Sequence, residues 1–207
     1  QKTEMMKRIF ITGAVLVAAL SCGRSKTGGF SSGELEILNS SDSIMRVLTV
    51  RDSADLAVLR SVSSDFSAEA LRSDEFARLA ELMVATVTHP SQDGVGIAGP
   101  QVGLNRRIVA VQRFDKTREP FEVYANVRIV WMSDSLAYGP EGCLSVPDRR
   151  GNVLRSQQIV IEYADLASLS HSCDDIPMAR DTVSGFTAVI FQHEIDHLEG
   201  VLYIDRL

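Results

Sequence analysis

The sequence has 207 residues, of which 45% are hydrophobic and 23% are charged, and this length suits one ordinary globular domain with an additional terminal segment. Its formal net charge of −6 argues against a nucleic-acid-binding protein, because neutralising phosphate groups requires an excess of Lys and Arg. The three cysteines are odd in number and irregularly spaced, which argues against the disulfide framework of a small secreted domain.

The first predicted element is a targeting segment over residues 1–22. Two basic residues precede the largely apolar run 9–20, which is shorter than the roughly 20 residues of a transmembrane helix and typical of a signal-peptide core. Cys22 follows and resembles the lipidated first residue of bacterial lipoproteins, although Ala19 stands where that class usually has leucine. We therefore expect export and membrane attachment through lipidated Cys22, with a cleaved secretory signal or a cytoplasmic protein as alternatives.

The next segment, residues 23–43, is rich in Gly, Ser and Lys and has few large apolar side chains. This composition is typical of a flexible tether between an anchor and a folded domain. The folded domain is therefore expected over residues 44–207.

Within that domain the hydrophobic pattern predicts a helix, several strands and a last helix. Ser73 is a candidate N-cap for the first helix, whose apolar residues recur at helical spacing until Pro90. Short β-type runs are expected at 108–111, 127–132 and 159–161. The last helix begins after Ser184 and ends at Gly200. This order favours an α+β fold over a doubly wound parallel sheet.

The strongest chemical motif is His193-Glu194-Ile195-Asp196-His197 in that last helix. A spacing of four residues places both imidazoles on one face, near enough to share one metal ion. Glu194 can then act as general acid and base on a water at that metal. A solvated helix end with two surface histidines is the alternative when the motif is considered alone.

A cysteine supplies a third potential ligand. Cys143 lies in the segment Glu141-Gly142-Cys143-Leu144-Ser145, beside glycine and turn residues. A thiolate and two imidazoles leave the fourth position of a tetrahedral ion open, as catalytic sites require. Taken alone, such a cysteine is more often a buried structural thiol.

A glycine-rich segment, G-V-G-I-A-G-P-Q, spans residues 94–101. No Lys-Ser/Thr pair follows it, which argues against a nucleotide phosphate loop. Close approach of its backbone to an extended peptide is the favoured interpretation, with the Gln101 side-chain amide as a donor to a reacting carbonyl.

In this order the three segments resemble the peptide deformylase family, whose motifs are G-φ-G-φ-A-A-x-Q, E-G-C-L-S and Q-H-E-x-D-H. The matching segments here are 94–101, 141–145 and 192–197. The resemblance extends from about Met45 to Leu207 and implies an α+β deformylase fold, with antiparallel or mixed sheets around a central metal-binding helix. Gly99 stands in place of the family's alanine, and loss of that methyl group is expected to loosen the loop slightly.

By the same resemblance, the implied metal ligands are Cys143, His193 and His197. Glu194 is implied as the proton shuttle, with Gln101 and the backbone N–H of Leu144 stabilising the oxyanion. The implied reaction is hydrolysis of N-formylmethionyl peptides with release of formate, a step in protein biosynthesis. The family is known for Fe²⁺, whereas Cys and His donors on their own suggest Zn²⁺.

The resemblance also implies peptide contacts at Gly96 and Arg150. Val95, Val189 and Ile190 are candidates for the apolar pocket that accepts methionine, with plain core packing as the alternative. Two other functions stay open. One is an exported peptide-binding lipoprotein that kept the fold and lost catalysis, and the other is a metallopeptidase of the HExxH type that cuts internal peptide bonds.

Overall fold

The structure is a computed structural model that describes residues 29–170 and 174–207. The targeting segment predicted over residues 1–22, with its candidate lipidation site Cys22, lies outside the described residues. Across the described ranges, no helix combines the length and the apolar character needed to cross a lipid bilayer.

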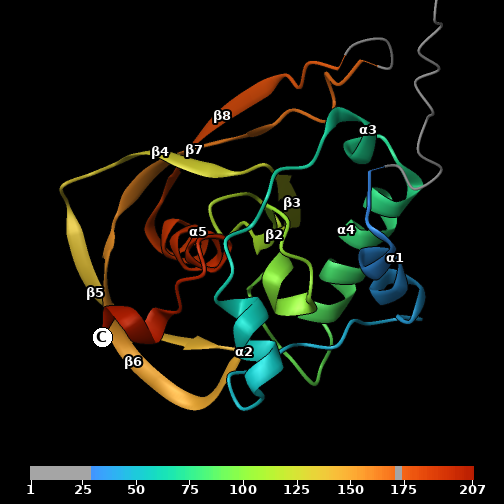
Figure 1. The fold of residues 1–207 in the computed structure, drawn as a ribbon. Coiled ribbons are helices and arrows are strands. Elements are labelled where there is room, and N and C mark those ends of the chain that lie inside the picture. The colour runs from blue at the N-terminus through green and yellow to red at the C-terminus, as the bar shows by residue number, and fades with distance from the viewer. Residues whose placement is uncertain (1–28, 171–173) are drawn as a thin grey trace, which may run out of the picture.

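The described residues form helices, strands and two short 3₁₀ turns (Figure 1). The helices are α1 (Ser32–Asn39), α2 (Ser53–Leu59), α3 (Ala68–Leu71), α4 (Asp74–Val87) and α5 (Gly185–Leu198). The strands are β1 (Gly96–Ala98), β2 (Ile108–Gln112), β3 (Phe121–Ala125), β4 (Arg128–Met132), β5 (Leu136–Cys143), β6 (Val146–Ser156), β7 (Gln158–Ala164) and β8 (Met178–Ser184). The 3₁₀ turns are η1 (Gly99–Val102) and η2 (Tyr203–Arg206).

The strands pair antiparallel in three sheets, in the orders β1-β2-β3, β4-β7-β8 and β5-β6. Helix α5 lies at the centre, with the β4-β7-β8 sheet along one side and η2 and the long β5-β6 hairpin beside its C-terminal end (Figure 1). Helix α4 packs on the face of the β1-β2-β3 sheet that is turned away from α5, and α1 packs against α4 (Figure 1). The predicted α+β class with a central helix is confirmed.

Helix α5 is buried along almost its whole length, which explains why its sequence is apolar beyond one stripe. Ala188, Phe191 and Leu198 are fully buried among apolar side chains of the two three-stranded sheets. The Phe191 ring meets the Tyr124 ring of β3 edge-on, with centroids 5.0 Å apart. Polar residues of such a helix lose their water and therefore need partners inside the protein.

The first predicted helix is confirmed as α4. The Ser73 hydroxyl accepts a hydrogen bond from the Phe76 N–H at 3.2 Å, so Ser73 is the expected N-cap. Leu79 and Met83 are fully buried against the β1-β2-β3 sheet. The predicted β-runs correspond to β2, β4 and β7, except that Val127 lies just before β4, and the last helix is confirmed as α5.

The tether predicted over residues 23–43 is wrong for the part that the structure describes. Ser31 and Glu34 form a reciprocal capping box at the start of α1. Phe30 and Leu38 are buried in the same core as α4, and Glu34 pairs with the Arg106 guanidinium. The composition suggested a tether because the segment has few apolar residues. Those few are enough for α1, because Leu35, Ile37 and Leu38 pack against the core.

Candidate active site

Three potential metal ligands meet where β5 ends beside α5. The Cys143 sulfur and one ring nitrogen each of His193 and His197 all lie within 4.8 Å of one another. The Cys143 Sγ lies 3.2 Å from Nε2 of His197. Because ligand atoms bonded to one ion at about 2.0–2.3 Å must gather in this way, the donor set fits a tetrahedral transition-metal ion. The fold thus brings the three predicted ligands together.

The β5-β6 hairpin places the cysteine. Cys143 is the last residue of β5 and pairs with Val146, with a register shift just before it. Val146 is buried in a small core with Leu202 and Tyr203, which fastens this end of the hairpin to the C-terminal turn. Cys143 is a free thiol.

A buried carboxylate orients the first histidine. Glu141 Oε2 lies 2.8 Å from Nδ1 of His193, which leaves Nε2 of that ring to bind a metal. Although burial opposes it, the hydrogen bonds with His193 and Arg155 lower the pKa of Glu141 to about 2, so it stays a carboxylate. Burial also opposes protonation of His193, but hydrogen bonds with Cys143 and Glu141 raise its pKa to about 10. An imidazole binds a metal in its neutral form, so a metal ion at Nε2 would compete with a proton for this ring.

The second histidine lies in a different environment. His197 is buried, and its Nδ1 has no hydrogen-bond partner among the described residues. Burial lowers the pKa of His197 well below its ordinary value, with the charge of His193 adding to the effect. His197 is therefore neutral, the form in which an imidazole binds a metal.

Glu194 is buried beside the three ligands, and its Oε2 has no hydrogen-bond partner among the described residues. Burial raises the pKa of Glu194 to about 7, against the opposing charge of His193. A carboxyl group with such a pKa can both accept and donate a proton near neutral pH. Gly96 of β1 makes room for it, because a Cβ at that position would stand 2.5 Å from Glu194 Oε1.

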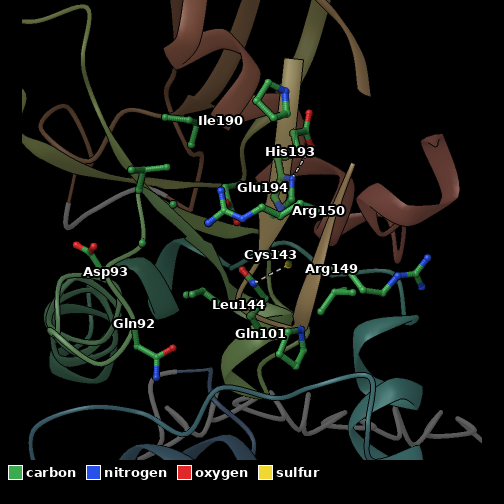
Figure 2. A pocket seen from close by; sticks show the side chains of 18 of the residues that line it. Gln92, Asp93, Gln101, Cys143, Leu144, Arg149, Arg150, Ile190, His193 and Glu194 are labelled. Carbon is green, nitrogen blue, oxygen red and sulfur yellow. Dashed lines mark hydrogen bonds and ion pairs between the residues drawn. The ribbon is translucent and has the colours of Figure 1, made fainter. Parts of the chain in front are cut away.

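Gln101 in the turn η1 lies beside Cys143, on the side away from His193 and Glu194 (Figure 2). Its Oε1 accepts a hydrogen bond from the Ala98 N–H at 2.8 Å, which fixes the orientation of the amide. Its Nε2 donates to Ser145 Oγ at 3.3 Å and to Cys143 Sγ at 3.5 Å. The amide N–H group is therefore held at the candidate metal site, as an oxyanion donor requires.

The expectation for Gly99 is wrong. A Cβ there would stand 2.6 Å from the Arg106 carbonyl oxygen and 2.7 Å from the Leu104 carbonyl oxygen. Backbone therefore occupies the space of the missing methyl group, and the loop is close-packed rather than loosened.

A cavity of about 440 Å³ opens beside the candidate ligands. The predicted contacts that line it are Gly96, Arg150, Val95, Val189 and Ile190, together with Leu144 and Gln101. Figure 2 shows Ile190, Arg150 and Glu194 on the same side of Cys143, above it in the view. Sequence reasoning missed Phe186, which also lines the cavity, is 55% exposed and packs on Phe114 with ring centroids 5.2 Å apart. Its position three residues before Val189 places it on the same helix face.

Comparisons with known proteins agree on one family. The model of the polypeptide deformylase family matches residues 44–207. A peptide deformylase of Leptospira biflexa is 37% identical over 157 residues, which cover 72% of this chain and 82% of that protein. Peptide deformylase 2 of Gloeobacter violaceus is 39% identical over 135 residues, covering 65% of this chain and 67% of that protein.

Solved structures give the same result. The Met-Ala-Ser-bound class I type b peptide deformylase of Acinetobacter baumannii aligns with a TM-score of 0.67 at 33% identity, covering 79% of this chain and 98% of that chain. The peptide deformylase of Thermotoga maritima aligns with a TM-score of 0.67 at 28% identity, covering 80% of this chain and 99% of that chain.

Proposed function

The chain belongs to the polypeptide deformylase family, and we propose that its Cys143, His193 and His197 centre hydrolyses the formyl amide of N-formylmethionyl peptides. The products are formate and a peptide with a free N-terminal amine. The observation that supports this most strongly is the buried Glu194 carboxyl group beside the Cys/His/His cluster at the wall of the cavity.

The ion we propose is Fe²⁺, by resemblance to the family, with Zn²⁺ as the alternative that the same donors fit. Such an ion supplies a Lewis acid that polarises the formyl oxygen and makes water more acidic.

Glu194 moves the protons of the reaction. It accepts a proton from the attacking water and delivers it to the nitrogen of the leaving amine. A pKa of about 7 supports both halves of this cycle, because neither protonation state is strongly favoured near neutral pH. Gln101 Nε2 and the Leu144 N–H donate hydrogen bonds to the oxygen that becomes negative as water adds to the formyl carbon.

The cavity binds the peptide. Val95, Val189, Ile190 and Phe186 contribute apolar side chains to its lining, which suits a methionine side chain. Gly96 and Arg150 contact the peptide backbone. A volume of about 440 Å³ suits one large side chain and the adjoining backbone rather than a folded protein surface.

We also propose that the protein is exported and held at a membrane through a lipid on Cys22, on the basis of the apolar run 9–20 and the small residues that close it. Fractionation of cells that express wild type and Cys22→Ala tests this. Release of the variant from the membrane fraction is expected, and unchanged retention would remove lipidation as the explanation. An exported deformylase would act on formylated peptides other than chains emerging during translation.

Formate release from formyl-Met-Ala-Ser by anaerobically purified, iron-loaded protein tests the catalytic proposal. Wild type should release formate, and Glu194→Gln should lose at least about 10²-fold in kcat while still binding metal. No release by wild type, with peptide still bound, would favour the non-catalytic binding protein. Cleavage of an N-acetylated peptide at an internal bond would favour the metallopeptidase.

A further inference from the structure

A chain of ion pairs links the C-terminal turn to the first metal-binding histidine. Arg206 of η2 donates to Asp196 of α5 through Nε at 2.6 Å and Nη2 at 2.5 Å. Asp196 Oδ2 also accepts from Arg155 Nη1 at 2.6 Å. Arg155 in turn donates to both oxygens of Glu141, at 2.8 and 3.1 Å, and Glu141 holds Nδ1 of His193. The series therefore starts in η2, passes through α5, β6 and β5, and ends at the imidazole of His193.

Burial increases along this chain from its outer end. The Arg206 side chain is 44% exposed, Asp196 is 12% exposed, and Arg155 and Glu141 are 4% and 5% exposed. The buried trio of Asp196, Arg155 and Glu141 contains two carboxylates and one guanidinium, so it lacks one positive charge when His193 is neutral. Arg206 supplies that charge at the point where the chain meets solvent.

Loss of that charge has a direct consequence for the histidine. A buried ion pair that loses one partner leaves an uncompensated charge, which is strongly unfavourable. Without Arg206, Asp196 would depend on Arg155 alone and would compete with Glu141 for it. A weaker hold of Arg155 on Glu141 loosens the carboxylate that orients His193.

The same turn also touches the histidine directly. The Tyr203 ring stacks on the His193 ring, with centroids 5.8 Å apart and an angle of 25° between the planes. A second arginine, Arg60, fastens η2 from outside by pairing with Asp205, where both side chains are 38% exposed. Among the described residues, no hydrogen bond or ion pair joins Arg60 or Asp205 to Glu141, Arg155 or Asp196, so this pair offers a matched comparison.

We propose that Arg206 is a positioning residue of the metal centre. It neutralises Asp196, so that Arg155 remains on Glu141 and Glu141 keeps Nε2 of His193 directed at the ion. The inference rests on the proposed metal-dependent function, but metal affinity tests it without any turnover.

The experiment compares Arg206→Met with Arg60→Met, since each removes a two-pronged arginine–carboxylate pair from the same turn. Affinity for Zn²⁺ and for Co²⁺ is measured by competition with a chelator, and the visible absorption of the Co²⁺ protein reports ligand geometry. Arg206→Met should raise the metal dissociation constant about tenfold and alter the Co²⁺ spectrum, as loss of an outer partner of a metal ligand typically does. Arg60→Met should lower Tm but leave the affinity within about twofold of wild type.

Wild-type affinity and spectrum in Arg206→Met would overturn the proposal, and so would an equal loss in Arg60→Met, which would indicate a general loosening of η2. Arg206→Lys keeps the positive charge but cannot donate from two nitrogens at once, and its metal affinity should fall about threefold. If Arg206→Met does not fold, Arg206→Lys with wild-type affinity overturns the proposal. The iron-loaded Arg206 variants should also lose kcat with KM unchanged, and iron-loaded Arg60→Met should keep both values. If metal affinity depends on Arg206 but wild type releases no formate, the proposed function is refuted and the positioning role of Arg206 stands.

Discussion

Replacing Gly96 by alanine should disable the proton shuttle while leaving the metal ligands in place. The added Cβ would stand 2.5 Å from Oε1 and 2.9 Å from Cδ of Glu194, and 2.8 Å from Cγ2 of Ile190. Ordinary contacts to a Cβ begin near 3.4 Å, so the carboxyl group has to retreat by about 1 Å within a close-packed interior. A displacement of that size costs about 10²-fold in rate, and the overpacking costs about 1–3 kcal/mol of stability.

The assay measures kcat and KM for formate release from formyl-Met-Ala-Ser, the metal content and Tm. We expect kcat to fall by about 10²-fold with metal content unchanged. Gly139→Ala on β5 is the matched control, since a Cβ there meets no atom within 4 Å, and its kcat should equal that of wild type. Wild-type kcat in Gly96→Ala would refute the reasoning, and so would a fall in rate that only follows loss of metal.

Three further changes test other parts of the structure. Burial opposes the shift, but the hydrogen bond with Arg106 lowers the pKa of Glu34 below its ordinary value of 4.5. The stability that Glu34 contributes is therefore fully present above pH 4.5 and is lost as the pH falls through the lowered pKa. Glu34→Gln should therefore lower the unfolding free energy by about 1 kcal/mol at pH 7 and approach wild type towards pH 2, whereas Glu36→Gln should change it little at either pH. Gly99→Ala should cost about 1–3 kcal/mol in chemical denaturation, and an unchanged midpoint would contradict the crowding by backbone carbonyls. Chelation should lower the Tm of wild type, because the ion binds only the folded state, but should have little effect on Cys143→Ser.

The candidate ligands could be predicted from the sequence because most of their geometry is local. His193 and His197 share a helix face by spacing alone, whereas Cys143 was assigned as a ligand because the segment 141–145 resembles a motif of the family. The buried helix α5 and the amphipathic helix α4 were also predictable, because their apolar patterns are long. Short elements such as α1 were not, although the capping box at Ser31 was a usable sign of a helix start.

The residues that hold the ligands could not be predicted in the same way. Arg155 and Arg206 are two among many arginines in the sequence, and nothing local marks them as neighbours of Asp196. Their meeting depends on the register of β5 and β6 and on where η2 returns to α5. Gly99 shows the same limit, since a comparison of motifs finds a missing methyl group, and only the packed loop shows what fills its place.

The partners of the acids explain why one of them can move protons. Glu141 is tied to Arg155 and His193, and Asp196 is tied to Arg155 and Arg206. Protonating Glu141 would break a buried ion pair, which is costly. Glu194 alone among the acids of these two motifs has no ion pair within the described residues, and burial raises its pKa to about 7. Its proton can therefore come and go without breaking an ion pair that orients the ligands, so a shuttle and a rigid metal site can share one helix.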